Sequence, residues 1–223
     1  MDQAFIDFLA RWSHVVFGIT WIGLLYYFNF VQTEYFKEAD PDARTDAFSK
    51  LAPRALWWFR WGAMFTFLTG LIMLGVRGAG VTLSITLGSV LGTLMFLNVW
   101  LIIWPNQKIV IASNQQVKAG GEADPAAAGA APKAAIASRT NTLFSIPMLF
   151  FMVSSAHLAT NTGIGFGMIG DASMTGLVVS LLIIAALELN GIFGKQGPMT
   201  TVRGVIGSSL VLTAVLWAVA ALL

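Results

Sequence analysis

Residues 202–222 read VRGVIGSSLVLTAVLWAVAAL, and a run of this kind decides the fold class. Arg203 is its one charged residue, and about 20 apolar residues at 1.5 Å each cross the ~30 Å hydrocarbon core of a bilayer. Five similar runs lie at roughly 5–34, 55–76, 84–104, 137–160 and 174–193. The sequence therefore predicts an all-α integral membrane bundle of about six transmembrane helices, with residues 1–223 forming a single transmembrane domain.

The composition agrees with a lipid environment. Hydrophobic residues make up 57% of the chain and charged residues 11%, and the mean hydropathy is +0.75, too apolar for a soluble domain of this length. The chain has no cysteine, which excludes disulfide frameworks, thiolate metal sites and covalent c-type haem within it. A formal charge of +2 without a basic patch sets nucleic-acid binding aside.

The distribution of lysine and arginine predicts the orientation. An even number of spans puts both termini on one side, where only Arg11 and Arg77 are basic. The opposite side carries the other eleven basic residues and is cytoplasmic by the positive-inside rule. These are Lys37, Arg44, Lys50, Arg54, Arg60, Lys108, Lys118, Lys133, Arg139, Lys195 and Arg203. We therefore expect a multi-pass protein of the bacterial inner membrane with periplasmic N- and C-termini.

Local sequence features add five expectations. The first residues, MDQAFIDFLARW, lack the basic start of a signal peptide, so the first helix should stay in the membrane. The low-complexity stretch 118–134 (KAGGEADPAAAGAAPKA) predicts a flexible cytoplasmic loop, and we expect the glycine-rich stretch 160–173 to dip back toward the bilayer. Pro147 should kink its helix or free a carbonyl, and Gly88 with Gly92 predicts a close helix contact.

His14 and His157 are the only histidines of the chain. They fall early in the first span and late in the fourth, so we expect both at a similar depth near the periplasmic face. Ionisable groups inside spans are costly and are therefore candidates for function. One imidazole from each of two helices supplies the two axial ligands of a b-type haem. Gly18, one turn from His14, would admit the macrocycle, and Arg11 and Arg77 would pair with its propionates.

Other interpretations of the histidines remain open. Each ring can hydrogen-bond a neighbouring helix or sit at the membrane interface, and together they can serve another metal or a proton relay. A non-haem metal usually needs a third protein ligand, for which Asp2, Asp7 and Asp171 are the periplasmic candidates.

A second set of polar residues falls toward the cytoplasmic side. Glu188, in the apolar run LLIIAALELNG, needs a cation or a proton, and Arg60 or Arg139 lies at a suitable depth to pair with it. With Asn98 and Asn141, these residues predict a pocket for a planar anionic substrate or a quinone head group. A salt bridge that fixes helix packing explains the same residues equally well.

Four strings resemble the membrane domain of bacterial membrane-bound urate oxidases, also called urate hydroxylases. They are HVVFGITWIGLLYYFNFVQ (14–32), WWFRWGAMFTFLTGL (57–71), NVWLIIWPNQKIV (98–110) and RTNTLFSIPMLFFMVSSAH (139–157). The resemblance implies urate oxidation, with electrons passed to the respiratory chain. Members typically carry a C-terminal cytochrome c domain, and residues 1–223 contain no CxxCH segment for one.

The residues and the resemblance lead to one main hypothesis and two alternatives. The leading hypothesis is a redox protein that binds one haem b through His14 and His157. It would pass electrons from a reduced substrate, with urate or a quinone as candidates, to a c-type cytochrome or a respiratory complex. The alternatives are a non-catalytic subunit of a respiratory or photosynthetic assembly and a small proton-coupled transporter. A reduced-minus-oxidised spectrum separates the redox hypothesis from the other two.

Overall fold

The computed structural model describes residues 2–78, 80–158 and 174–223, and within them it is a bundle of helices without strands. Six continuous helical stretches are long and apolar enough to cross a membrane. The elements in chain order are α1 (Gln3–Tyr26), η1 (Tyr27–Gln32), α2 (Thr33–Glu38), α3 (Pro41–Arg77), α4 (Leu83–Leu97), η2 (Asn98–Ile103), α5 (Trp104–Lys118), α6 (Ala126–His157), α7 (Met174–Phe193), η3 (Gly197–Thr200) and α8 (Val202–Leu222). The predicted all-α membrane bundle of six spans is confirmed.

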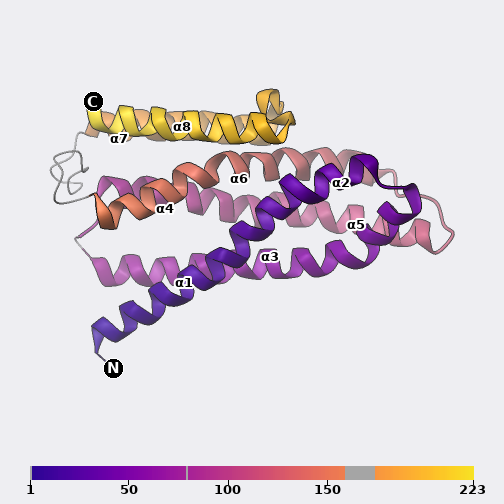
Figure 1. Cartoon of the computed structure of the whole chain (residues 1–223), viewed down its shortest axis with the longest axis horizontal. Coiled ribbons are helices and arrows are strands. Elements are labelled where there is room, and N and C mark those ends of the chain that lie inside the picture. The colour runs from indigo at the N-terminus through magenta and orange to yellow at the C-terminus, as the bar shows by residue number, and fades with distance from the viewer. Residues whose placement is uncertain (1, 79, 159–173) are drawn as a thin grey trace.

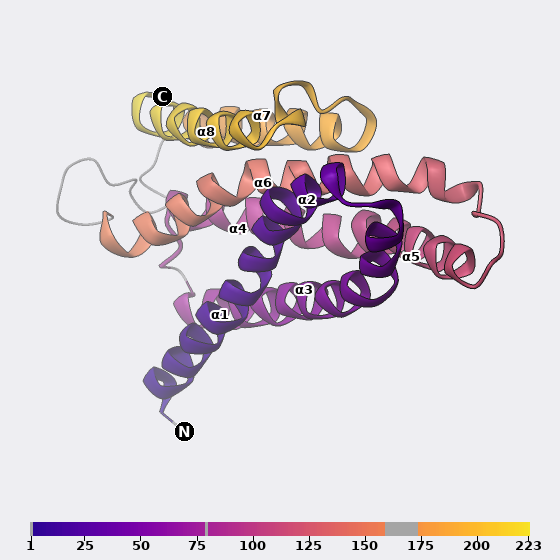
Figure 2. The ribbon, with the colours of Figure 1, turned by 45° about the vertical axis from the view of Figure 1, so that its right-hand side comes forward.

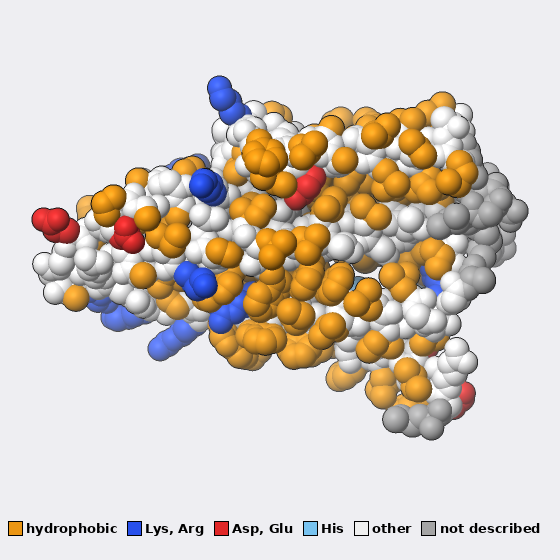
Figure 3. Space-filling model, turned by 180° about the vertical axis from the view of Figure 1, so that it is seen from behind, with side chains coloured by type: hydrophobic (Ala, Val, Ile, Leu, Met, Phe, Trp, Pro, Cys, Tyr) orange, Lys and Arg blue, Asp and Glu red, His pale blue; other side chains and the backbone are white. Residues whose placement is uncertain are grey.

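Both termini lie at one end of the bundle, as an even number of spans requires (Figure 1). We call this the terminal end, and we call the opposite end, where α3 begins and α5 ends, the basic end. Lysine and arginine side chains gather toward the basic end, while hydrophobic side chains cover the middle of the face in Figure 3. A broad apolar surface of this kind is suited to lipid.

Helix α6 lies at the centre of the bundle. In its most apolar stretch 61% of residues are buried inside the protein, against 17% to 39% in the other five spans. It contacts α1, α4, α5, α7 and α8, and α7 with α8 forms a pair along one side of it (Figure 2). A helix surrounded by protein can carry polar residues that a lipid-facing helix cannot, so α6 is where a functional site is best accommodated.

Small residues bring the helices close together. A Cβ on Gly88 would lie 3.1 Å from the backbone nitrogen of Met152, and one on Gly92 would lie 3.3 Å from the end of the same side chain. The predicted close contact at this pair of glycines is therefore confirmed, between α4 and α6. Gly62 of α3 likewise lies against α1, 3.1 Å from the backbone nitrogen of Trp21. These contacts are typical of membrane bundles, where close backbone approach replaces the hydrophobic effect.

Pro147 interrupts the hydrogen bonding of α6 as expected. Proline has no N–H, so the carbonyl of Leu143 loses its helical donor. The hydroxyl of Ser209 in α8 donates to this carbonyl at 2.6 Å. The freed carbonyl thus becomes a tether between α6 and α8.

The stretch 118–134 is only partly a loop. Helix α5 ends at Lys118 and α6 begins at Ala126, so residues 119–125 form the connection and 126–134 are helical. Alanine has the highest helix propensity of all residues, and the alanines outweigh the glycine and proline among them. The glycine-rich stretch 160–173 lies outside the described residues.

Candidate functional site

Two π-helical turns, η1 and η2, face α6. In η1 the N–H of Thr33 bonds to the carbonyl of Phe28, five residues back, and the Thr33 hydroxyl donates to the same oxygen at 2.6 Å. In η2 the N–H of Trp104 bonds to the carbonyl of Val99, again five residues back. Pro105 follows directly, and the wider turn leaves room for a ring that an α-turn would not accommodate. Turns of this type occur frequently at functional sites.

The turn η2 builds a buried polar network at the centre of the bundle. The amide of Asn98 donates one hydrogen to Asn141 Oδ1 at 3.0 Å and the other to Glu188 Oε2 at 3.1 Å. The amide of Asn141 donates to the carbonyl of Met95 at 2.9 Å. All three side chains are buried. The structure therefore joins α4, α6 and α7 through residues that the sequence predicted to lie toward one side of the membrane.

The turn η1 makes a similar connection to α6, at Ser138, one turn before Asn141. Asn29 donates to Ser138 Oγ at 2.8 Å and to the carbonyl of Leu25 at 2.9 Å. One turn away, the hydroxyls of Tyr26 and Ser145 lie 2.9 Å apart. Both π-helical turns thus place a buried asparagine against α6.

Arg139 follows Ser138 directly in the sequence of α6, so its side chain leaves the helix on a different face from Ser138 and Asn141. Its side chain is buried, with 4% of the residue exposed, and its Nη1 has no hydrogen-bond partner within the described part of the chain. Glu34 is the carboxylate close enough to act on it electrostatically, but both oxygens of Glu34 accept from Lys37, at 2.7 and 2.8 Å. A buried guanidinium nitrogen without a hydrogen-bond partner is costly, so Nη1 is available to bind an acceptor.

The predicted ion pair between Glu188 and an arginine is not among the salt bridges of the described residues. Glu188 accepts from Asn98 instead. Arg60 lies over the ring of Trp104, 3.7 Å from its centroid, in a cation–π contact. Arg60 is therefore held on the α3–α5 side, and depth alone did not reveal which face of its helix it occupies.

His14 packs between α1 and α3. Its Nδ1 lies 3.2 Å from Thr69 Oγ1, and a Cβ on Gly70 would lie 3.2 Å from its Cε1. The Thr69 hydroxyl also donates to the carbonyl of Phe65 at 2.6 Å. Gly18 faces Thr66 of α3, so its missing side chain serves the helix contact. The ring of His14 is thus directed at a neighbouring helix, as the structural interpretation expected.

Two contacts between neighbouring helices give the relative levels of the bundle. Phe67 of α3 stacks on Phe96 of α4 with centroids 4.2 Å apart. One residue before Phe96, the carbonyl of Met95 accepts from Asn141 of α6. Residues 67, 95–96 and 141 therefore lie at nearly one depth.

The two histidines lie at different depths relative to this level. His14 contacts Gly70, three residues along α3 from Phe67, whereas His157 is the last residue of α6 and is exposed. At 1.5 Å per residue, the two levels differ by on the order of 15 Å. A haem ligated by both rings needs them on opposite faces of one porphyrin, so the residues as placed do not fit that cofactor. The two-histidine haem b stays a prediction.

Arg11 and Arg77, the two arginines expected near the periplasmic face, differ in their contacts. Arg11 is exposed and pairs with Asp7 at 2.9 Å, whereas Nη1 of Arg77 is buried without a partner in the described residues. Asp171, the third candidate metal ligand, lies outside those residues. Within the described ranges no group of three or more His, Asp or Glu side chains is arranged to hold a metal ion.

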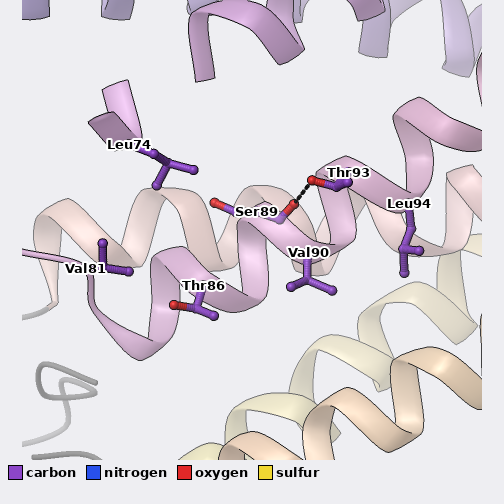
Figure 4. Close-up of a pocket in the computed structure, with 7 residues that line it drawn as sticks. All are labelled: Leu74, Val81, Thr86, Ser89, Val90, Thr93 and Leu94. Atoms are coloured by element: carbon purple, nitrogen blue, oxygen red, sulfur yellow. Dashed lines mark hydrogen bonds between the residues drawn. The ribbon is translucent and has the colours of Figure 1, made fainter. Parts of the chain in front are cut away.

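A surface groove of about 390 Å³ runs along α4. Its lining comes from one face of α4 together with Leu74 and Val81 (Figure 4). The hydroxyl of Thr93 is already bonded to the carbonyl of Ser89 at 2.7 Å, so the lining is chiefly apolar. It offers a surface for lipid chains and no ligand for an anion.

Several residues of the site were not singled out by the sequence. Gln32 Oε1 and Trp100 Nε1 are buried without hydrogen-bond partners in the described residues, and both lie on π-helical turns. Pro105 is a sequence feature that could have indicated η2, since a proline inside an apolar run predicts a distorted turn before it. For η1 the sequence offers no comparable signal.

Comparison with known proteins gives one match. A family model described as urate oxidase N-terminal matches residues 76–220, which include α4 to α7 and most of α8. No curated protein and no solved structure matches the chain. The matched region contains Asn98, Arg139, Asn141 and Glu188.

Proposed function

Because this chain belongs to the urate oxidase N-terminal family, we propose that it is the membrane domain of a urate-oxidase-like oxidoreductase, which takes electrons from a planar anionic substrate. Urate is the first candidate for that substrate. The observation that carries the proposal is Arg139, a buried cation whose Nη1 has no partner in the described residues. An anion bound to it by a charge-assisted hydrogen bond offsets the cost of its burial.

Asn98, Asn141 and Glu188 have a supporting role in this proposal. Their hydrogen bonds run to one another and to the Met95 carbonyl, so they hold α4, α6 and α7 in register at the level of α6 that carries Arg139. Side chains fixed in this way keep a binding group in place before the substrate arrives. Arg60, stacked on Trp104, would contact the substrate only after leaving that ring.

The electrons pass to a partner in this proposal. A c-type cytochrome or a respiratory complex would accept them on the periplasmic side, where the charge distribution places both termini. A haem b within the domain would supply one-electron transfer. Because His14 and His157 do not meet in this arrangement, we assign no step to it.

The proposal is tested by titrating the detergent-solubilised chain with urate in a calorimeter. Arg139→Gln should weaken urate binding at least tenfold, since a hydrogen bond to a charged group contributes about 1.5–3 kcal/mol. Arg203→Gln, an exposed arginine on α8, is the matched control and should leave binding unchanged. If wild type and Arg139→Gln bind urate with equal affinity, Arg139 is not part of the binding site.

A second measurement tests the redox part. Membranes that contain the chain should reduce added cytochrome c when urate is supplied, and membranes with Arg139→Gln should do so more slowly. If the wild-type chain neither binds urate nor supports this reduction, the accessory-subunit and transporter alternatives take its place.

A further inference from the structure

The outward face of α3 changes from apolar to charged at Arg54. On this face the side chains of Phe65, Leu68 and Ile72 are exposed, and their spacing of three and four residues aligns them in one stripe along the helix. Arg54 lies on the same stripe and is also exposed. From Arg54 to Ile72 is about 27 Å at 1.5 Å per residue, close to the ~30 Å thickness of the hydrocarbon core. Arg54 therefore lies where acyl chains give way to lipid head groups.

A surface pocket of about 360 Å³ contains this arginine. Its lining is Pro53, Arg54, Trp57 and Trp58. The two indole rings meet edge to face with their centroids 5.0 Å apart, and both are exposed. Each indole adds an N–H donor to those of the guanidinium. The pocket thus combines a cation with two aromatic walls whose apolar rings and polar N–H groups suit the membrane interface.

The charges beside the pocket leave an excess of positive charge. The carboxylate of Asp46 is shared by two lysines, Lys50 at 2.7 Å and Lys118 of α5. Arg54 lies one turn beyond Lys50 and has no carboxylate partner within the residues that the structure describes. One carboxylate against three cations attracts an anion to this end of α3.

We propose that this pocket binds an anionic phospholipid, with the phosphate on Arg54 and the acyl chains along the stripe toward Ile72. A guanidinium forms paired hydrogen bonds with phosphate oxygens. A free phosphate would satisfy Arg54 but leave the apolar stripe uncovered, whereas a lipid covers both. The choline of a zwitterionic lipid brings a positive charge that the lysines repel, so the pocket selects phosphatidylglycerol over phosphatidylcholine. Arg139 and its neighbours take no part in this site, which is independent of the proposed function.

The test measures lipid binding to the full detergent-solubilised chain by native mass spectrometry. The probes are phosphatidylglycerol and phosphatidylcholine with identical acyl chains, each added alone and in the presence of excess inorganic phosphate. Arg54→Gln removes the charge from the pocket, and Arg54→Lys keeps it. Arg44→Gln is the matched control, because Arg44 is an exposed arginine of the same helix outside the pocket.

We expect the wild type to bind phosphatidylglycerol about fivefold more tightly than phosphatidylcholine, since one basic residue at a membrane surface contributes about this factor. Arg54→Gln should bind the two lipids equally, while Arg54→Lys and Arg44→Gln should keep the preference. The proposal is overturned if the wild type shows no preference, if Arg54→Gln keeps it, or if Arg44→Gln loses it equally. Displacement of phosphatidylglycerol by inorganic phosphate would also overturn it, because the pocket would then select a free anion.

Discussion

Ser209 in α8 donates a 2.6 Å hydrogen bond to the main-chain carbonyl of Leu143 in α6, an oxygen that Pro147 leaves without a helical donor. The proline that weakens one helix thereby creates the attachment point for another. In lipid every backbone group must be satisfied within the protein, so the hydroxyl and the proline depend on each other.

We therefore expect Ser209→Ala to lower the free energy of unfolding by about 1–2 kcal/mol, because the Leu143 carbonyl is left unpaired. In a Pro147→Ala background residue 147 regains its N–H, and the same substitution should cost less. Thermal unfolding in detergent measures this double-mutant cycle. Ser208→Ala is the control, and equal costs in both backgrounds would contradict the coupling.

The Asn98 network predicts unequal effects of two neighbouring substitutions. Asn98→Ala leaves the acceptors of Glu188 and Asn141 unpaired and should cost about 2–3 kcal/mol. Glu188→Gln keeps an oxygen that can accept from Asn98 and should cost less than about 1 kcal/mol. The apparent melting temperatures of the two purified variants check this order, and the reverse order would show that Glu188 needs its charge for stability.

The contact between Gly191 of α7 and Thr140 of α6 predicts a steric effect. A Cβ on Gly191 would lie 2.5 Å from Thr140 Oγ1 and 3.0 Å from its Cβ. Gly191→Ala should therefore destabilise the protein by about 1–3 kcal/mol. At Gly207 a Cβ meets nothing within 4 Å, so Gly207→Ala should be neutral or slightly stabilising. Similar melting temperatures for both variants would argue against this packing.

The two histidines should differ in their effect on stability. His14→Ala removes a ring packed between α1 and α3 and should cost about 2 kcal/mol, whereas His157→Ala removes an exposed ring and should cost less than about 0.5 kcal/mol. Reduced-minus-oxidised spectra of both variants test the haem prediction at the same time. If both lose the same haem bands, the two rings share one haem and must come together in the loaded protein.

The orientation can be tested with engineered cysteines, since the natural chain has none. Gln3→Cys reports on the terminal end and Glu122→Cys on the basic end, and both positions are exposed. A membrane-impermeant maleimide should label Gln3→Cys, but not Glu122→Cys, in cells whose outer membrane has been opened. If only Glu122→Cys is labelled, the basic end faces the periplasm and the predicted orientation is wrong.

The spans could be predicted because crossing a bilayer needs a length of apolar sequence that few other structures require. Their ends could not, since α3, α5 and α6 continue beyond the hydrocarbon core with polar residues that still favour a helix. Pro147 was interpreted correctly because its effect is local and steric. Its partner Ser209 was not found, because the partner depends on how α8 packs.

In the candidate site the sequence predicted how deep a residue lies in the membrane better than which neighbour its side chain faces. Counting residues placed Asn98, Asn141 and Glu188 toward the same side of the membrane, and the structure joins them by hydrogen bonds. For the histidines the same counting gave a similar depth, whereas His14 packs within the span between α1 and α3 and His157 is the last residue of α6, so their shared haem stays a prediction. The counting also missed Arg60, which faces Trp104. Rotation of a helix about its axis is set by packing, which the sequence shows only indirectly.

The π-helical turns have a consequence for the whole length of their helices. Each turn holds one residue more than an α-turn, which rotates everything after it by about 100° relative to an uninterrupted helix. The stretch from Leu83 to Lys118 can therefore direct one face to α6 before η2 and a different face to α6 after it. The one additional residue thus sets the rotation of the following helix about its axis. Deleting one residue from η2 would turn the side chains of α5 away from their neighbours, although no residue of α5 itself would be substituted.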